Sequence, residues 1–144
     1  MSEPFDPRTV QVRPAATVML VRDTPGAASG DHSGGPADGS PGVEVFMLRR
    51  TANASFAAGM YVFPGGRVDG VDGAAEIAPF CRGLDDRSAS DQLGLDAGGL
   101  AYWVAAVREC FEEAGLLMAT RRDGGPLRLR PDDRHAVHDG ELSM

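Results

Sequence analysis

Two short apolar segments in the first third of the chain have the length and composition of β-strands. Residues 15–21 and 43–48 are rich in Val, Leu, Met and Phe. Between them, residues 24–42 consist mostly of Gly, Ser, Pro, Ala and Asp. Such a segment cannot bury enough apolar surface to offset its ordering entropy. We therefore predict two paired strands joined by a flexible loop over residues 24–42, with His32 in solvent.

The middle of the chain predicts a further strand, a turn and two short helices. Residues 60–63 are apolar and run into Pro64-Gly65-Gly66, a typical turn sequence because glycine accepts positive φ without steric cost. Residues 74–84 have the pattern of a helix interrupted at Pro79. Residues 88–95 predict a second short helix.

The clearest amphipathic pattern begins near Gly99 and ends at Gly115, a typical residue just beyond a helix end. Three glutamates project to the side opposite its apolar stripe, since successive residues turn by about 100°. The stripe consists of Leu100, Val104, Val107 and Phe111. Further on we predict a strand over residues 116–119, a turn at Gly124-Gly125-Pro126 and a polar helix from about Asp132. Tyr61, Phe63 and Trp103 are expected in the core.

Composition places the chain among ordinary globular domains and narrows its partners. Of its 144 residues 42% are hydrophobic, and 14 Lys and Arg against 21 Asp and Glu give a net charge of −7. Because a nucleic-acid-binding protein ordinarily needs a basic face, this acid excess argues against nucleic acid as partner. Small polyanionic substrates stay compatible with it if divalent cations bridge them to carboxylates.

Compartment signals point to the cytoplasm. No apolar run approaches the roughly 20 residues of a membrane-spanning helix, and residues 1–14 lack the pattern of a secretory signal. Cys81 and Cys110 are too few for a disulfide framework and lack metal-site spacing. We expect a cytoplasmic protein with reduced thiols and no membrane contact.

Glu109, Glu112 and Glu113 bring three carboxylates together on one helical face. Like charges at this spacing destabilise an isolated helix by a few tenths of a kcal/mol per pair. Two interpretations stay open on spacing alone. The face is either solvated, with Arg108 paired to Glu112 at i+4, or it binds a hard cation such as Mg²⁺ or Mn²⁺, which prefers oxygen ligands.

Residues 108–116, RECFEEAGL, resemble the second half of the Nudix box, R-E-U-x-E-E-x-G-U, where U is a bulky aliphatic residue. The first half, G-x5-E, matches Gly66 with Asp72 in the glutamate's place. Thirty-five residues separate Asp72 from Arg108, far more than in the usual box, so we assign residues 73–98 to an insertion within it. This insertion, together with MLRR at 47–50 and VFPGG at 62–66, is similar to the coenzyme A diphosphatase-like branch of the Nudix hydrolases.

This resemblance implies an α/β fold, namely an α/β/α sandwich around a mixed sheet, built as a single domain over residues 1–144. The loop takes nineteen residues, and the box holds twenty-eight more residues than usual between Asp72 and Arg108, which leaves 97 residues for the scaffold. Only 28 residues follow Leu116, fewer than this fold ordinarily uses there. We therefore expect the sequence to be truncated at its C-terminus. An unpaired sheet edge would then favour association into a homo-oligomer.

The resemblance also implies a metal site and a catalytic set. Glu109, Glu112 and Glu113 would bind Mg²⁺ or Mn²⁺, with a backbone carbonyl at Gly65 or Gly66 as a further ligand. Arg108 would orient a glutamate through a salt bridge. The catalytic set comprises Arg108, Glu109 and Glu112, with Glu112 favoured as the general base.

The implied reaction is hydrolysis of a diphosphate bond in a nucleoside-diphosphate-linked small molecule, with coenzyme A or acyl-coenzyme A favoured. Arg49 and Arg50 end a strand that points toward the substrate cleft in this fold, and the planar guanidinium suits phosphate. One alternative is a non-catalytic Nudix-like module, or an inactive fragment, that binds a nucleotide or a partner. A second is a pyrophosphatase acting on ADP-ribose or NADH.

Overall fold

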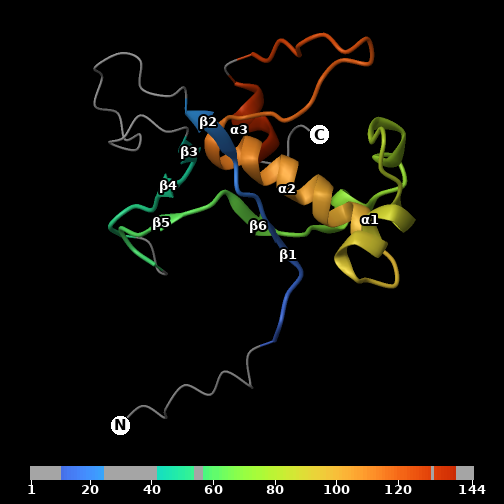
Figure 1. Ribbon diagram of the computed structural model, residues 1–144, viewed down its shortest axis with the longest axis horizontal. Coiled ribbons are helices and arrows are strands. Elements are labelled where there is room, and N and C mark those ends of the chain that lie inside the picture. The colour runs from blue at the N-terminus through green and yellow to red at the C-terminus, as the bar shows by residue number, and fades with distance from the viewer. Residues whose placement is uncertain (1–10, 25–41, 54–56, 131, 139–144) are drawn as a thin grey trace.

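One long helix organises the fold, and two strands, a 3₁₀ turn and the two other helices lie against it (Figure 1). The computed structural model describes residues 11–24, 42–53, 57–130 and 132–138. The helices are α1 (Asp86–Leu93), α2 (Gly99–Ala114) and α3 (Asp133–His138), with 3₁₀ turns η2 (Gly70–Gly73) and η3 (Ala78–Phe80). The strands are β1 (Ala15–Thr17), β2 (Val21–Thr24), β3 (Gly42–Val45), β4 (Leu48–Arg49), β5 (Tyr61–Val62) and β6 (Gly65–Arg67).

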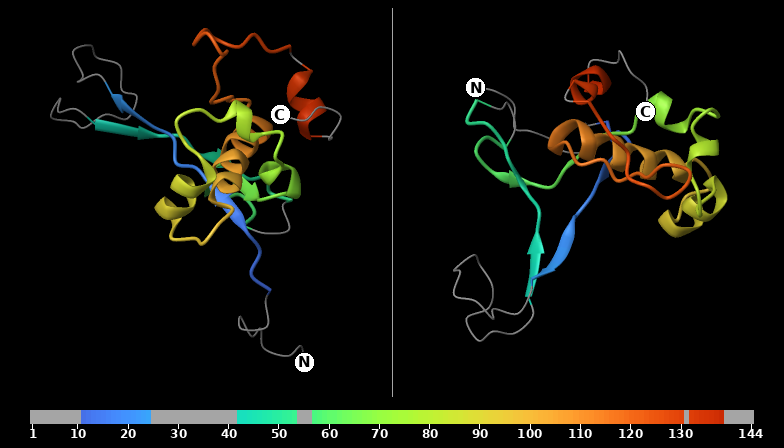
Figure 2. Two further views of the ribbon diagram at one scale, coloured as in Figure 1. Left: turned by 90° about the vertical axis from the view of Figure 1, so that its right-hand side faces the viewer. Right: turned by 90° about the horizontal axis from the view of Figure 1, so that it is seen from above.

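The strands pair two by two, as β1–β6, β2–β3 and β4–β5. All three pairs are antiparallel, with Ala16 opposite Gly66 in the first and Arg22 opposite Glu44 in the second. No parallel pair, which a mixed sheet would require, occurs among the described strands. In Figure 2 the β2–β3 hairpin extends away from the helices, whereas β1 and β6 contact α2.

The two apolar segments at 15–21 and 43–48 do pair, as predicted, but each is divided into two strands. The chain changes partner at each division: Val18 N–H donates to Pro64 O at 3.0 Å, and Phe46 N–H donates to Leu20 O at 2.9 Å. β2 and β3 form the predicted hairpin. Apart from Thr24 and Gly42, the loop predicted over residues 24–42, His32 included, lies outside the described residues.

The turn predicted at residues 64–66 is wrong, because Gly65 and Gly66 form part of strand β6. A Cβ on Gly65 would meet the backbone of Ala16 and Thr17 on β1. A Cβ on Gly66 would collide with the carboxylate of Glu109 on α2. These glycines therefore allow β6 to lie close between β1 and α2, rather than allowing a turn.

Helix α2 forms and ends as predicted. Gly115 has φ 70° in the left-handed region, and its N–H donates to Phe111 O at 2.8 Å. The predicted apolar stripe is right only in part, since Phe111 is buried but Leu100, Val104 and Val107 are half-buried. The buried positions of the helix also include Ala105, Arg108 and Cys110. Burial extends beyond one stripe because β1, β6, η2, α1 and α3 surround the helix.

The insertion contains one helix rather than two. Residues 74–84, predicted as a helix, hold only turns and η3, since Pro79 lies in its first turn and Phe80 is 78% exposed, so no apolar face is buried. The second predicted helix is present as α1, whose N-cap Asp85 accepts from Ser88 N–H at 2.8 Å. This hydrogen bond lowers the pKa of Asp85.

Helix α1 also caps the N-terminus of α2. The N-cap position of α2 is Gly98, at φ 79°, which has no side chain to cap with. Asp86 accepts from the N–H groups of Gly98 and Leu100, both at 3.0 Å, and Ser90 Oγ accepts from Gly99 N–H at 2.8 Å. The insertion therefore supplies the acceptors that the first turn of α2 needs.

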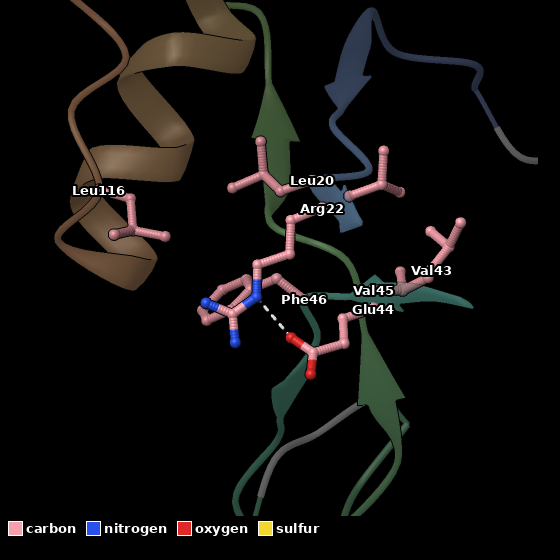
Figure 3. Close-up of a pocket in the computed structure, with 8 residues that line it drawn as sticks. Leu20, Arg22, Val43, Glu44, Val45, Phe46 and Leu116 are labelled. Atoms are coloured by element: carbon pink, nitrogen blue, oxygen red, sulfur yellow. Dashed lines mark hydrogen bonds and ion pairs between the residues drawn. The ribbon is translucent and has the colours of Figure 1, made fainter. Parts of the chain in front are cut away.

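The segment that follows α2 is irregular, so the strand predicted over 116–119 is wrong. Leu116 and Met118 are 42% and 53% exposed, and neither pairs with a described strand. Leu116 instead borders a pocket of about 540 Å³ with the apolar side chains of β2 and β3 and the Arg22–Glu44 ion pair (Figure 3). The predicted turn near residues 124–126 and the polar helix are present, the latter as α3.

Three aromatic side chains were expected in the core. Tyr61 and Trp103 are 62% and 44% exposed, so this expectation is wrong for them, and Phe63 is half-buried.

Within the ranges that the structure describes, no helix is both long enough and apolar enough to cross a membrane.

Replacing Asp86 with Ala removes the acceptor for two N–H groups at the start of α2. We expect the free energy of unfolding to fall by about 1 kcal/mol, and the melting temperature by roughly 3 °C. Circular dichroism during heating measures this. Gln92→Ala, at an exposed position of the same helix, is the matched control. Equal melting temperatures for the two variants would contradict the capping role.

Candidate active site

The site is built around the buried guanidinium of Arg108, whose side chain is 11% exposed. Its Nε and Nη2 donate to the two carboxylate oxygens of Asp72 at 2.9 and 3.0 Å, and Nη2 also donates to Arg67 O at 2.9 Å. Asp72 is only 1% exposed. The hydrogen bonds that Arg108 donates to Asp72 raise the pKa of Arg108. This bidentate pair ties α2 to the chain segment that follows β6.

The remaining nitrogen of Arg108 holds two of the three glutamates. Nη1 donates to Glu109 Oε1 at 3.0 Å and to Glu112 Oε1 at 3.1 Å. These two side chains are 13% and 12% exposed. The i+4 pair of Arg108 and Glu112 is therefore present, as predicted. Glu113 is exposed, as the solvated interpretation expects, whereas the burial of Glu109 and Glu112 does not fit that interpretation.

The glutamates face the glycine strand β6. Glu113 Oε2 accepts from Gly65 N–H at 3.0 Å, and the carboxylate of Glu109 lies against the α-carbon of Gly66. Burial raises the pKa of Glu109, the charge and hydrogen bond of Arg108 oppose the rise, and Glu112 and Glu113 add to it. Carboxylates are held here at the cost of desolvation and mutual repulsion.

The donor set fits a hard cation by its chemistry. Four carboxylates lie within 4.0 Å of Arg108, those of Asp69, Asp72, Glu109 and Glu112, so one positive charge faces four negative ones, and Glu113 stands beside them. Across the described part of the chain, no three Asp, Glu, His or Cys side chains are grouped as a metal requires. Arg108 lies between Glu109 and Glu112, and Glu113 is turned to Gly65. A bound cation would need the glutamates to turn from these partners.

A pocket of about 380 Å³ brings the two arginines together with two of the glutamates. It lies between β4, β5 and the C-terminal end of α2, and Arg49, Arg50, Glu112 and Glu113 line it with Leu48, Thr51 and Val62. Among the described residues, Nε of Arg50 is a buried side-chain nitrogen with no hydrogen-bond partner. Glu109 is not part of this lining.

Sequence reasoning did not assign a role to Asp72, although it placed Asp72 at the position of the box glutamate. The carboxylate is one methylene shorter than glutamate and still reaches both guanidinium nitrogens. The sequence signal for this contact was an acidic residue, Asp72, at the glutamate position of the first half of the box. The thirty-five residues between Asp72 and Arg108 concealed the contact, because they separate the two side chains widely in sequence.

The sequence and fold of this chain were compared with protein families and with solved structures. No protein-family model matches the chain. A solved structure, a Nudix hydrolase from Alicyclobacillus acidocaldarius, matches with a TM-score of 0.59 and 28% identity, over 92% of this chain and 51% of that one. The chain therefore has the Nudix fold, of the α/β class predicted.

Curated relatives point to one branch of that class. The acyl-coenzyme A diphosphatase NUDT19 of Gallus gallus is 32% identical over 90% of this chain, and that of Homo sapiens is 28% identical over 88%. The homologues are thus Nudix hydrolases of the branch that the sequence resembles. The chain spans 40% of the length of each of these two relatives.

The Arg108–Asp72 pair provides a stability test. Asp72→Ala leaves the guanidinium buried beside a cavity, and we expect the free energy of unfolding to fall by about 3 kcal/mol in urea denaturation. Asp72→Asn keeps the shape and one acceptor, so its loss should be smaller. Asp69→Asn is the control, since Asp69 is 52% exposed and 3.6 Å from Arg108. Losses at Asp72 no larger than at Asp69 would refute the anchoring role.

Proposed function

We propose that this protein is a divalent-metal-dependent hydrolase that cleaves a diphosphate bond in a nucleoside-diphosphate-linked substrate, with coenzyme A or acyl-coenzyme A favoured. The observation that carries the proposal is the meeting of opposite charges in one pocket. Two glutamates from α2 face two arginines from the β4 segment, on a Nudix fold. The names of the curated relatives favour an acyl-coenzyme A substrate.

Glu109, Glu112 and Glu113 would hold Mg²⁺ or Mn²⁺, and the carbonyl of Gly66, whose α-carbon faces the Glu109 carboxylate, would complete the ligands. When bound, such an ion supplies charge neutralisation of the diphosphate and a lowered pKa for water. Arg108 keeps Glu109 and Glu112 side by side while the cation is absent. It therefore offsets part of the repulsion that an empty acidic cluster carries.

We assign the general base to Glu112. Glu112 and Glu113 line the pocket and Glu109 does not, so only the first two reach a water molecule placed there. Of these, Glu112 is 12% exposed and is held beside Glu109 by Arg108 until a cation binds, whereas Glu113 is exposed. A carboxylate within reach of the water is the first requirement for proton removal.

Arg49 and Arg50 would bind the phosphates. Arg50 is the stronger candidate, because its Nε is buried and has no partner in the described residues, so a phosphate oxygen would satisfy a donor that is otherwise desolvated. Arg49 lies in β4 and is exposed. Because Arg49 is exposed, water competes with a phosphate for its guanidinium, so we expect it to contribute less to binding than Arg50.

Net charge and the two cysteines bear on the partner and the location of this protein. The acid excess disfavours nucleic acid, so the partner is a small molecule. Cys81 and Cys110 are free in the structure, in keeping with a cytoplasmic, reducing location. Association into a homo-oligomer stays a prediction.

Glu112→Gln tests the catalytic assignment. We expect turnover of acyl-coenzyme A with millimolar Mg²⁺ to fall about 100-fold or more, because the amide cannot accept the proton. The melting temperature without metal should change little, while its increase with Mg²⁺ should shrink. Glu76→Gln, at an exposed position in the insertion, is the control.

The same assay separates the alternatives. Wild-type activity retained in Glu112→Gln would overturn the site assignment. A wild-type protein that binds nucleotides but hydrolyses none would instead be a non-catalytic Nudix-like module. Faster hydrolysis of ADP-ribose or NADH than of acyl-coenzyme A would favour the pyrophosphatase alternative.

Arg50→Met tests the phosphate site. We expect KM to rise about tenfold with a smaller change in kcat, since a charge-assisted hydrogen bond to the substrate is lost. Arg49→Met should raise KM less. Arg22→Met, on the β2–β3 hairpin outside the pocket, should behave as the wild type. An unchanged KM in Arg50→Met would exclude this residue from substrate binding.

A further inference from the structure

The last turn of α2 is held from outside by one side chain of α3. Arg134 Nε donates to the carbonyl oxygen of Glu112 at 2.7 Å, and its Nη2 donates to that of Glu113 at 2.7 Å. The last carbonyls of a helix have no partner within the helix. A positive charge at that end also meets the negative end of the helix dipole. Arg134 therefore provides hydrogen-bond donors for the backbone carbonyls of Glu112 and Glu113, the two residues whose carboxylates line the pocket.

The surroundings leave room for this contact. Gly115 follows the helix in the left-handed conformation, and a Cβ there would lie 3.8 Å from Cδ of Arg134. The Arg134 side chain thus passes beside the helix end to reach the carbonyls. Its guanidinium matches two successive carbonyls through two nitrogens, whereas a lysine would offer one ammonium group.

Glu112 is consequently fixed at two points. Arg108 holds its carboxylate from within the helix at 3.1 Å, and Arg134 holds its backbone carbonyl from α3. Glu113 is fixed likewise, by Gly65 N–H at its carboxylate and by Arg134 at its backbone. Movement of the last turn would displace both carboxylates together.

We propose that Arg134 is a positioning residue for the carboxylates of Glu112 and Glu113. It lies about twenty positions beyond the glutamates, outside the Nudix box, and acts through the backbone of α2 rather than on substrate. The proposal rests on the proposed function for its catalytic consequence. Its structural consequence, a fixed helix end, is measurable without any activity.

The experiment compares Arg134→Met, Arg134→Lys and the control Arg128→Met. Arg128 is exposed, and in the described residues its side chain makes no hydrogen bond or ion pair. In Arg134→Met we expect kcat to fall about tenfold, since a small misplacement of catalytic groups is costly, and the Mg²⁺ concentration for half-maximal activity to rise several-fold. KM should stay within about twofold, because Arg134 does not line the pocket. Arg134→Lys should lie between Met and wild type.

Amide hydrogen exchange at residues 113–117 separates this proposal from the proposed function. Faster exchange there in Arg134→Met, with wild-type exchange in the β1–β6 pair, supports the positioning role even if no diphosphate substrate is hydrolysed. If Arg134→Met fails to fold, Arg134→Lys provides the same comparison. Unchanged exchange, or an unchanged Mg²⁺ requirement in an active enzyme, would overturn the proposal.

Discussion

The buried ion pair between Arg108 and Asp72 is the interaction on which the rest of this structure depends. It connects the middle of α2 to the segment after β6. The third nitrogen of the Arg108 guanidinium, Nη1, donates to Glu109 and Glu112. Removing a charge from water is costly unless its partner is well placed, and the two parallel hydrogen bonds meet that condition. One guanidinium thus both anchors the helix and gathers carboxylates that would otherwise repel each other.

The glycines of β6 are the second constraint, because they decide how deeply the glutamates are buried. With side chains at Gly65 and Gly66, the strand could lie neither against β1 nor against Glu109. Close approach removes water from Glu109 and raises its pKa. An acidic helical face becomes a site only when a strand without side chains covers it, so the two halves of the motif depend on each other physically.

Local sequence signals predicted α2, its end at Gly115 and the Arg108–Glu112 pair, because these depend on spacing along one helix. Signals that depend on distant partners were misleading. The Pro-Gly-Gly sequence suggested a turn, yet contact with β1 and α2 makes Gly65 and Gly66 a strand. Residues 116–119 have strand composition but pair with no strand in the described chain. Pairing and burial, rather than propensity, decided both cases.

The insertion shows how a motif divided in sequence stays whole in space. Gly73, where the insertion begins, lies beside Ala101, with its Cβ position 3.4 Å from the alanine Cβ. The insertion returns at Gly99, two residues earlier on the same turn of α2. Because both ends meet at one place, the intervening chain closes a loop whose entropic cost grows only slowly with length. That place is the N-terminal end of α2, about 15 Å of helix away from Glu109. The added chain can therefore contribute Asp86 and Ser90 as caps without disturbing the carboxylates at the other end.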